Sequence, residues 1–330
     1  MNITENADGS VELSSKAYIE SLVDKYLPEP LSSYPSASAP ASDDLRKAYQ
    51  RALEAHRARS HGESVDPIIQ KPYASLVGAM IYAVPGVRIA EAQAVGMLAR
   101  ALTFPTSELM KCAIRVLVHL GRTSHESLRF SHDSPDAAVL HVYTDSDWDM
   151  LNGTTGTVHM LAGAAIAHNS KKQPCISMSS TESEIIAASQ GALEACYFRR
   201  ILNEMGLPQL LPTKIKVDNQ GAIELSKHQK SCHRSRHVLR RYFKIRELQA
   251  MGEVEVEYCP TDVNWSDFLT KVVSPKKWAA CKAATTGHKP TSAPEASLHS
   301  DSPLDVWALH LGIPMRYAHR DLRTVRLRSR

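Results

Sequence analysis

Residues 141–148 read HVYTDSDW, and this stretch decides the fold. From Val139 to Thr144 apolar and polar residues alternate, which is the period of a strand buried on one face, and Asp145 follows directly. A second predicted strand, KIKV, is likewise followed at once by Asp218. A carboxylate at the end of a buried strand lies at the rim of a sheet, where packing alone rarely selects it. The two acids therefore mark the rim of a predicted α/β unit.

Two further carboxylates lie near the starts of predicted helices. Glu184 opens a long helix predicted from about Thr181 to Met205, and Asp267 lies in the first turn of a last helix from Asn264. Acids from four separated segments can converge in one pocket, where oxygen ligands suit Mg²⁺. Such a cluster needs cations to neutralise it, and two metals about 4 Å apart serve phosphodiester chemistry. The pattern predicts a metal-dependent hydrolase of phosphodiesters.

Each of these carboxylates also has a purely structural interpretation. Thr181-x-x-Glu184 fits a capping box, in which Glu184 bonds the N-cap amide. Asp145 and Asp218 fit turn residues after strands, and Asp267 fits a helix-dipole partner. The four acids together, in this order of elements, favour the metal site.

Short elements on both sides of the long helix complete the predicted α/β unit. They are a hairpin of strands 157–161 and 165–168, strands 175–178, 214–217 and 253–258, a helix after Asn219 and a basic helix at 238–250. Hairpin strands combined with helix-linked strands indicate a mixed sheet.

The segments before the α/β unit have helical periodicity. From residue 71 to 122 apolar residues recur at intervals of three and four positions, which predicts about three helices. Residues 10–27 have similar spacing. The predicted organisation is an ordered segment at 1–27, a linker with a solvated charged helix at 28–70, a helical unit at 71–123, the α/β unit at 137–275 and a disordered basic tail at 276–330.

The basic residues cluster in one stretch of the chain. Between Lys227 and Arg246 there are eight Lys or Arg residues and no Asp or Glu, as sequence-independent phosphate binding requires. The alternative is a solvated helix face. The residues expected to contact nucleic acid are Lys230, Arg234, Arg236, His237, Arg240, Arg241 and Lys244.

Zinc at Cys232-His233-x-x-x-His237 is not favoured, because no second cysteine pair lies nearby. Trp148 and Trp265 are expected to pack in the core or at its rim.

Composition limits the class of protein. The 330 residues are 43% hydrophobic and 22% charged, which suggests about two folding units. The net charge of +4 is too small to identify a partner. Six scattered cysteines without a C-x-x-C pair predict reduced thiols, and without a run of about 18 apolar residues no membrane span is predicted. We expect an intracellular protein, cytoplasmic or nuclear, with no membrane partner.

The motifs as a run resemble the ribonuclease H domain of copia-type retrotransposon Pol polyproteins. The matching strings are YTDSDW (143–148), NSKKQP (169–174), SSTESE (179–184), VDNQGAIEL (217–225), HRSRH (233–237) and SDFLTK (266–271). The resemblance implies a ribonuclease H-like α/β fold, with a mixed five-stranded sheet and flanking helices. It also implies hydrolysis of the RNA strand of RNA·DNA hybrids with two Mg²⁺, for which Mn²⁺ can substitute. The catalytic and metal-binding acids that it implies are Asp145, Glu184, Asp218 and Asp267, with Asp147 and Glu182 as near alternatives.

The preceding residues resemble other parts of the same polyproteins. The helical unit, including KPYASLVGAMIYA, is similar to the thumb and connection of the reverse transcriptase, and ADGSVELSSKAYIESLVDKY resembles the end of its palm. No Tyr-x-Asp-Asp motif is present, so we expect no polymerase activity. Two alternatives to an active nuclease remain: an inactive remnant that still binds nucleic acid, and a nuclease that needs the upstream palm and fingers as a partner.

Overall fold

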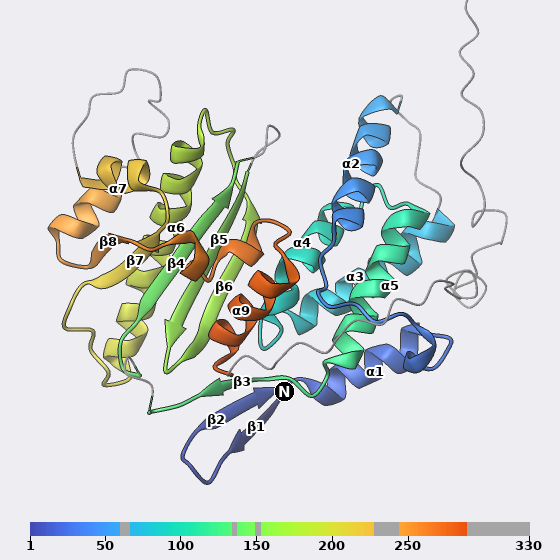
Figure 1. Ribbon diagram of the computed structural model, residues 1–330, viewed down its shortest axis with the longest axis horizontal. Helices are drawn as coiled ribbons and strands as arrows, with labels where there is room; N and C mark the ends of the chain where they lie inside the picture. Colours follow the sequence, from blue (N-terminus) through green and yellow to red (C-terminus); the bar gives the residue numbers. More distant parts are fainter. Residues whose placement is uncertain (60–66, 134–136, 149–152, 228–243, 289–330) are drawn as a thin grey trace, which may run out of the picture.

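The computed structural model describes residues 1–59, 67–133, 137–148, 153–227 and 244–288 (Figure 1). They form a five-stranded sheet with helices on both faces, a layer of further helices beside it, and a small three-stranded sheet near the N-terminus. The α/β class and the flanking helices predicted from the sequence are confirmed.

The five-stranded sheet has the order β6-β5-β4-β7-β8, with β4 at its centre. Its strands are β4 (His141–Asp147), β5 (Thr154–Leu161), β6 (Ala164–Lys172), β7 (Thr213–Val217) and β8 (Val254–Tyr258). The pairs β4–β5 and β5–β6 are antiparallel, whereas β4–β7 and β7–β8 are parallel. The sheet is therefore mixed, as predicted. Ala162 and Gly163, both with positive φ, make the tight turn between β5 and β6.

One face of the sheet is covered by α6 (Ser180–Glu204), close to the predicted long helix. Its apolar side packs on the strands, and the buried members of this core include Val142, Ile185, Ala188, Ile215 and Val256. Gly191 allows the close approach, because a Cβ there would lie 2.6 Å from the Thr144 side chain. Helix α7 (Gln220–Lys227) follows β7, and residues 244–250 are helical.

The opposite face of the sheet joins the core of the helical layer. The three helices predicted between residues 71 and 122 are confirmed as α3 (Pro67–Ala83), α4 (Ala92–Arg100) and α5 (Ser107–Arg122). Their buried residues form one hydrophobic cluster with Tyr143 and Val158 of the sheet and with Phe268. Figure 1 shows these helices beyond the β6 side of the sheet. The helical layer and the sheet are thus packed together rather than connected by chain alone.

The N-terminal part differs from the prediction of continuous helical spacing over residues 10–27. Helix α1 (Lys16–Tyr26) is preceded by β1 (Asn2–Glu5) and β2 (Val11–Ser14), and β2 pairs with β3 (Ser127–Phe130). A strand whose partner is more than 100 residues away has no local signal. The predicted charged helix is α2 (Asp43–Ala58). The linker before it is packed rather than free, because Tyr34 is buried.

Two predictions in the C-terminal half are wrong, and a third is wrong over its first residues. Residues 175–178 form no strand, and the residues after Asn264 form a 3-10 turn, η4 (Asp267–Leu269), in place of a helix. The tail expected to be disordered from residue 276 begins with α9 (Pro275–Thr286). This helix is ordered because Trp278 and Cys281 are buried in the core that the sheet shares with the helical layer. Residues 289–330 lie outside the described residues.

No helix in the described ranges is both long and apolar enough to span a membrane. The five cysteines within those ranges are free thiols, as expected; they are Cys112, Cys175, Cys196, Cys259 and Cys281.

Candidate active site

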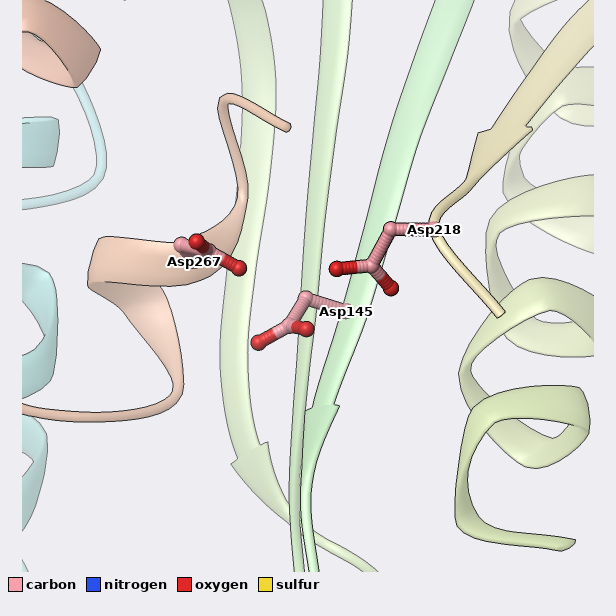
Figure 2. A group of neighbouring side chains, drawn as sticks. All are labelled: Asp145, Asp218 and Asp267. Atoms are coloured by element: carbon pink, nitrogen blue, oxygen red, sulfur yellow. The ribbon is translucent and has the colours of Figure 1, made fainter. Parts of the chain in front are cut away.

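Three carboxylates that are distant in sequence meet at one end of the sheet. Asp145 belongs to the central strand β4, Asp218 follows β7 directly, and Asp267 opens η4. One oxygen from each lies within 4.8 Å of the other two. Figure 2 shows the three side chains directed towards a common space. The structure therefore brings together three of the four acids expected at the site.

Glu184, the fourth predicted acid, lies beside this group from the first turns of α6. Its Oε1 accepts a hydrogen bond from the backbone N–H of Ser146 at 3.2 Å. Its Oε2 is buried and accepts no hydrogen bond from any described residue. Burial raises the pKa of Glu184 well above its ordinary value, and the charges of Asp145 and Asp218 raise it further. Glu184 thus shares the electrostatic environment of the group, although it is not within the tight cluster of three.

The near alternative Glu182 has a structural role instead. Ser179 caps α6 by accepting from the backbone N–H of Glu182. The Glu182 side chain in turn accepts from the backbone N–H of Met178. The cap at the start of α6 therefore belongs to Ser179 and Glu182 rather than to Thr181 and Glu184, which removes the structural alternative that the sequence left open for Glu184.

The other near alternative, Asp147, is the last residue of β4 and is partly exposed. The group of three close carboxylates does not include it. Asp145 is 1% exposed and lies two residues before Asp147 in β4, so Asp145 is the more deeply buried of the two carboxylates.

Burial dominates the electrostatics of Asp145. It raises the pKa of this carboxyl to about 7, the Lys271 ammonium opposes the rise, and the charges of Asp267 and Asp218 add to it. Lys271 Nζ lies 3.5 Å from Asp145 Oδ2 and 3.3 Å from Asp267 Oδ1. The Thr270 hydroxyl also donates to Asp145. The acidic group is thus only partly neutralised by the protein.

The position of η4 against the sheet depends on residues that the sequence analysis did not identify. Asn264 donates from its side chain to the Thr144 carbonyl at 3.0 Å, and its Oδ1 accepts from the backbone N–H of Ser266. Gly156, opposite Asp145 in the β4–β5 register, has no room for a side chain, because a Cβ would lie 2.7 Å from Thr270. The N-x-S spacing at residue 264 was the available signal, since Asn bonds its own backbone two residues on.

Most of the predicted nucleic-acid contacts fall on residues 228–243, which lie outside the described residues. Of the seven, Lys244 is described, and it forms an exposed ion pair with Glu247 at 3.3 Å. Arg246 from the same basic stretch donates to the Leu225 carbonyl at 2.6 and 3.0 Å. The role of this stretch in binding nucleic acid stays a prediction, as does the absence of zinc at Cys232.

The two tryptophans considered in the sequence differ in their exposure. Trp265 is partly buried, with its ring centroid 6.2 Å from that of Tyr143. Trp148 is 54% exposed, and its indole N–H donates to the Ser177 carbonyl at 3.1 Å. Trp265 packs in the core as expected, while Trp148 is held at the rim.

Relatives of the chain include transposon polyproteins, as the resemblance of the motifs implied. It is 31% identical over 290 residues to the Retrovirus-related Pol polyprotein from transposon TNT 1-94 of Nicotiana tabacum, covering 87% of this chain and 21% of that polyprotein. It is 29% identical over 206 residues to the corresponding polyprotein from transposon RE1 of Arabidopsis thaliana, covering 61% of this chain and 14% of that one. The chain therefore spans a small part of both relatives.

Another relative is named as an effector protein and not as a transposon polyprotein. The chain is 34% identical over 130 residues to Secreted RxLR effector protein 161 of Plasmopara viticola, covering 38% of this chain and 90% of that protein. No protein-family model matches the chain.

Similar solved structures include ribonuclease H domains and a reverse transcriptase. An N-terminal RNase H domain from Mycobacterium tuberculosis matches with a TM-score of 0.31 and 14% identity, over 43% of this chain and 94% of that one. A foamy viral protease-reverse transcriptase in complex with double-stranded DNA matches with a TM-score of 0.34 and 10% identity, over 67% and 35%.

Proposed function

Since the homologues of this chain are Pol polyproteins of copia-type retrotransposons, we propose that it is a Mg²⁺-dependent endonuclease that hydrolyses the RNA strand of RNA·DNA hybrids. It would act as the ribonuclease H part of a reverse transcriptase. The observation that carries the proposal is the convergence of Asp145, Asp218 and Asp267, with Glu184 beside them, from four separate elements.

The donor set fits a hard divalent cation. All four side chains offer carboxylate oxygens, which Mg²⁺ and Mn²⁺ prefer, and no cysteine or histidine belongs to the described group. Three of them are buried, and Glu184 Oε2 accepts no hydrogen bond from any described residue. Buried carboxylates that repel one another and are left incompletely paired are costly without a metal. Metal binding thus accounts for an arrangement that packing alone disfavours.

Each residue has a defined part in this proposal. Asp145, Asp218, Asp267 and Glu184 hold the metals, and Asn264 keeps the turn with Asp267 against β4. Two bound divalent ions would supply activation of the attacking water and stabilisation of the leaving oxygen. By family resemblance, the products carry 3′-hydroxyl and 5′-phosphate ends.

Substrate recognition is proposed to depend on backbone shape. The basic stretch between residues 227 and 246 would bind phosphates without reading sequence. Minor-groove width and the 2′-hydroxyls of the RNA strand distinguish a hybrid from double-stranded DNA. We therefore expect little sequence preference.

The test is cleavage of a labelled RNA·DNA hybrid by the purified full chain with Mg²⁺. We expect cleavage of the RNA strand that stops with EDTA and falls more than about 100-fold in Asp145→Asn. Asp262→Asn, which makes the same change at an exposed residue of the 3-10 turn η3 (Thr261–Val263), should cleave as the wild type does. Double-stranded DNA should remain intact.

Equal inertness of the wild type and Asp145→Asn would contradict cleavage by this chain alone. Adding a separately purified palm and fingers fragment then distinguishes the two alternatives. Restored cleavage would indicate a nuclease that needs the upstream partner, whereas continued inertness together with hybrid binding would indicate an inactive remnant. Polymerase activity is expected in neither case.

A further inference from the structure

Lys271 is in contact with two members of the acidic group at once. Its ammonium lies 3.5 Å from Asp145 Oδ2 and 3.3 Å from Asp267 Oδ1. Lys277 differs, because its ion pair reaches Asp267 alone, at 3.4 Å, and it also donates to the Thr261 carbonyl. Among the described residues, Lys271 is the lysine whose ion pairs join two of the three close carboxylates.

The position of Lys271 follows from the turn that carries it. Lys271 comes four residues after Asp267, and its backbone N–H bonds the Asp267 carbonyl at 3.3 Å, which keeps both side chains on one side of the turn. Thr270, the preceding residue, donates its hydroxyl to Asp145. The end of this turn therefore supplies both a neutral donor and a cation to Asp145.

We propose that Lys271 is a built-in counter-cation that holds the acidic group together without metal and competes with the divalent ion for it. The proposal depends on the proposed function only in treating the group as a metal site. The oxygens that face Lys271 belong to two expected metal ligands, so an ammonium and a divalent ion at the same oxygens repel each other. Metal binding then requires the ammonium to leave.

The exposure of Lys271 makes such a departure feasible. Its side chain is 41% exposed, whereas those of Asp145 and Asp267 are 2% and 4% exposed. A long flexible side chain can move its ammonium into water by changing rotamer while its stem stays packed. The carboxylates remain in place, and the metal-free chain does not have to refold. Lys271 would thus set the metal concentration at which the site fills.

The test measures binding of Mn²⁺ alone to the purified full chain by titration calorimetry, with no nucleic acid present. Lys271→Met should bind Mn²⁺ roughly tenfold more tightly than the wild type, because a competing cation is removed. The metal-free variant should also melt at a lower temperature than the metal-free wild type. Lys276→Met is the matched control, since Lys276 is exposed on α9 and makes the same charge change away from the group.

Several outcomes separate this proposal from the proposed function. Unchanged or weaker Mn²⁺ binding in Lys271→Met, with Lys276→Met unchanged, would overturn the role of Lys271 even if the chain cleaves hybrids. Tighter binding in Lys271→Met would support it even if the chain cleaves nothing. Lys271→Arg keeps the charge and should retain the melting temperature of the metal-free wild type; a loss as large as that of Lys271→Met would also count against the proposal.

Discussion

Asp145 and Asp218 lie at the same level of the sheet, Asp145 on β4 and Asp218 directly after the neighbouring parallel strand β7. Tyr143 of β4 pairs with Lys216 of β7, and each acid lies two residues beyond its member of that pair. The match of register explains why two segments more than 70 residues apart deliver carboxylates to one space. Side chains two residues apart along an extended chain point to the same face of the sheet, so the two acids remain next to each other beyond the paired residues. The site is thus a consequence of the pairing of these two strands.

The pH dependence of stability should report the burial of Asp145. Its pKa in the folded chain is about 7, above the ordinary 3.8, so the folded state holds a proton that the unfolded state has lost. The contribution of Asp145 to the free energy of unfolding therefore falls as pH rises from about 4 to 7. Asp145→Asn cannot lose a proton at this position and so avoids this loss of stability. At pH 8, the free energy of unfolding of the metal-free variant should exceed that of the wild type by roughly 1–3 kcal/mol.

Urea unfolding without metal at pH 5 and pH 8 measures this difference. The advantage of Asp145→Asn should be larger at pH 8 than at pH 5, and Asp262→Asn should show no such change. An advantage independent of pH would contradict a raised pKa of Asp145.

Metal binding should weaken as pH falls. Divalent ions bind ionised carboxylates, so protons on Asp145 and Glu184, whose pKa values are raised by burial, compete with the metal. At a fixed Mg²⁺ concentration, the rise in melting temperature should be clearly larger at pH 8 than at pH 6. Thermal unfolding with and without Mg²⁺ measures it, and an equal rise at both pH values would exclude competition by protons.

Two helical glycines should respond in opposite directions to the same substitution. Gly191→Ala in α6 places a Cβ 2.6 Å from Thr144, so it should destabilise the fold by about 1–3 kcal/mol. Gly78→Ala in α3 meets no atom within 4 Å and should stabilise by about 0.5–1 kcal/mol. Chemical denaturation of both variants tests the close packing of α6 on β4, which would be refuted if Gly191→Ala were as stable as Gly78→Ala.

A buried ion pair in the helical layer should be costly to break. Arg88 Nη2 lies 2.7 Å from Glu91 Oε1, both side chains are almost fully buried, and Arg88 also donates to the Thr123 carbonyl at 2.7 Å. Arg88→Met leaves the Glu91 charge buried and should destabilise by about 3–5 kcal/mol. Arg46→Met, at an exposed pair with Asp43, should cost less than about 1 kcal/mol. Similar losses in the two variants, measured in urea, would contradict the burial of Arg88.

The local parts of the fold could be predicted from the sequence, and the long-range parts could not. The strand that contains Asp145 and the long helix that contains Glu184 could be predicted from local sequence, and the structure confirms both, although β4 continues beyond Asp145 to Asp147. Residues 175–178 have strand-like residues, yet Ile176 and Met178 are exposed and pair with nothing in the described sheet. Helix α9 is ordered because Trp278 is buried against residues far away in sequence, and no local sequence pattern reveals such long-range packing.

In the candidate site, too, the local features could be predicted from the sequence and the long-range contacts could not. Asp145, Asp218 and Glu184 could be chosen because each lies at or near the end of a predictable strand or helix, whereas Asp267 lies in a 3-10 turn where a helix was predicted. The choice between Glu182 and Glu184 needed the observed cap at Ser179, because both acids fit a cap by spacing. Lys271 could not be assigned a partner from sequence, since its contact with Asp145 spans more than 120 residues.

The central claim is that the acidic group is a divalent metal centre, and anomalous diffraction from crystals soaked in Mn²⁺ tests it most directly. We expect an anomalous peak in the space between Asp145, Asp218 and Asp267, about 2.0–2.2 Å from their oxygens, and no such peak in crystals of Asp145→Asn. A wild-type map with no peak at these three carboxylates, at a Mn²⁺ concentration that gives peaks elsewhere on the protein, would contradict the account.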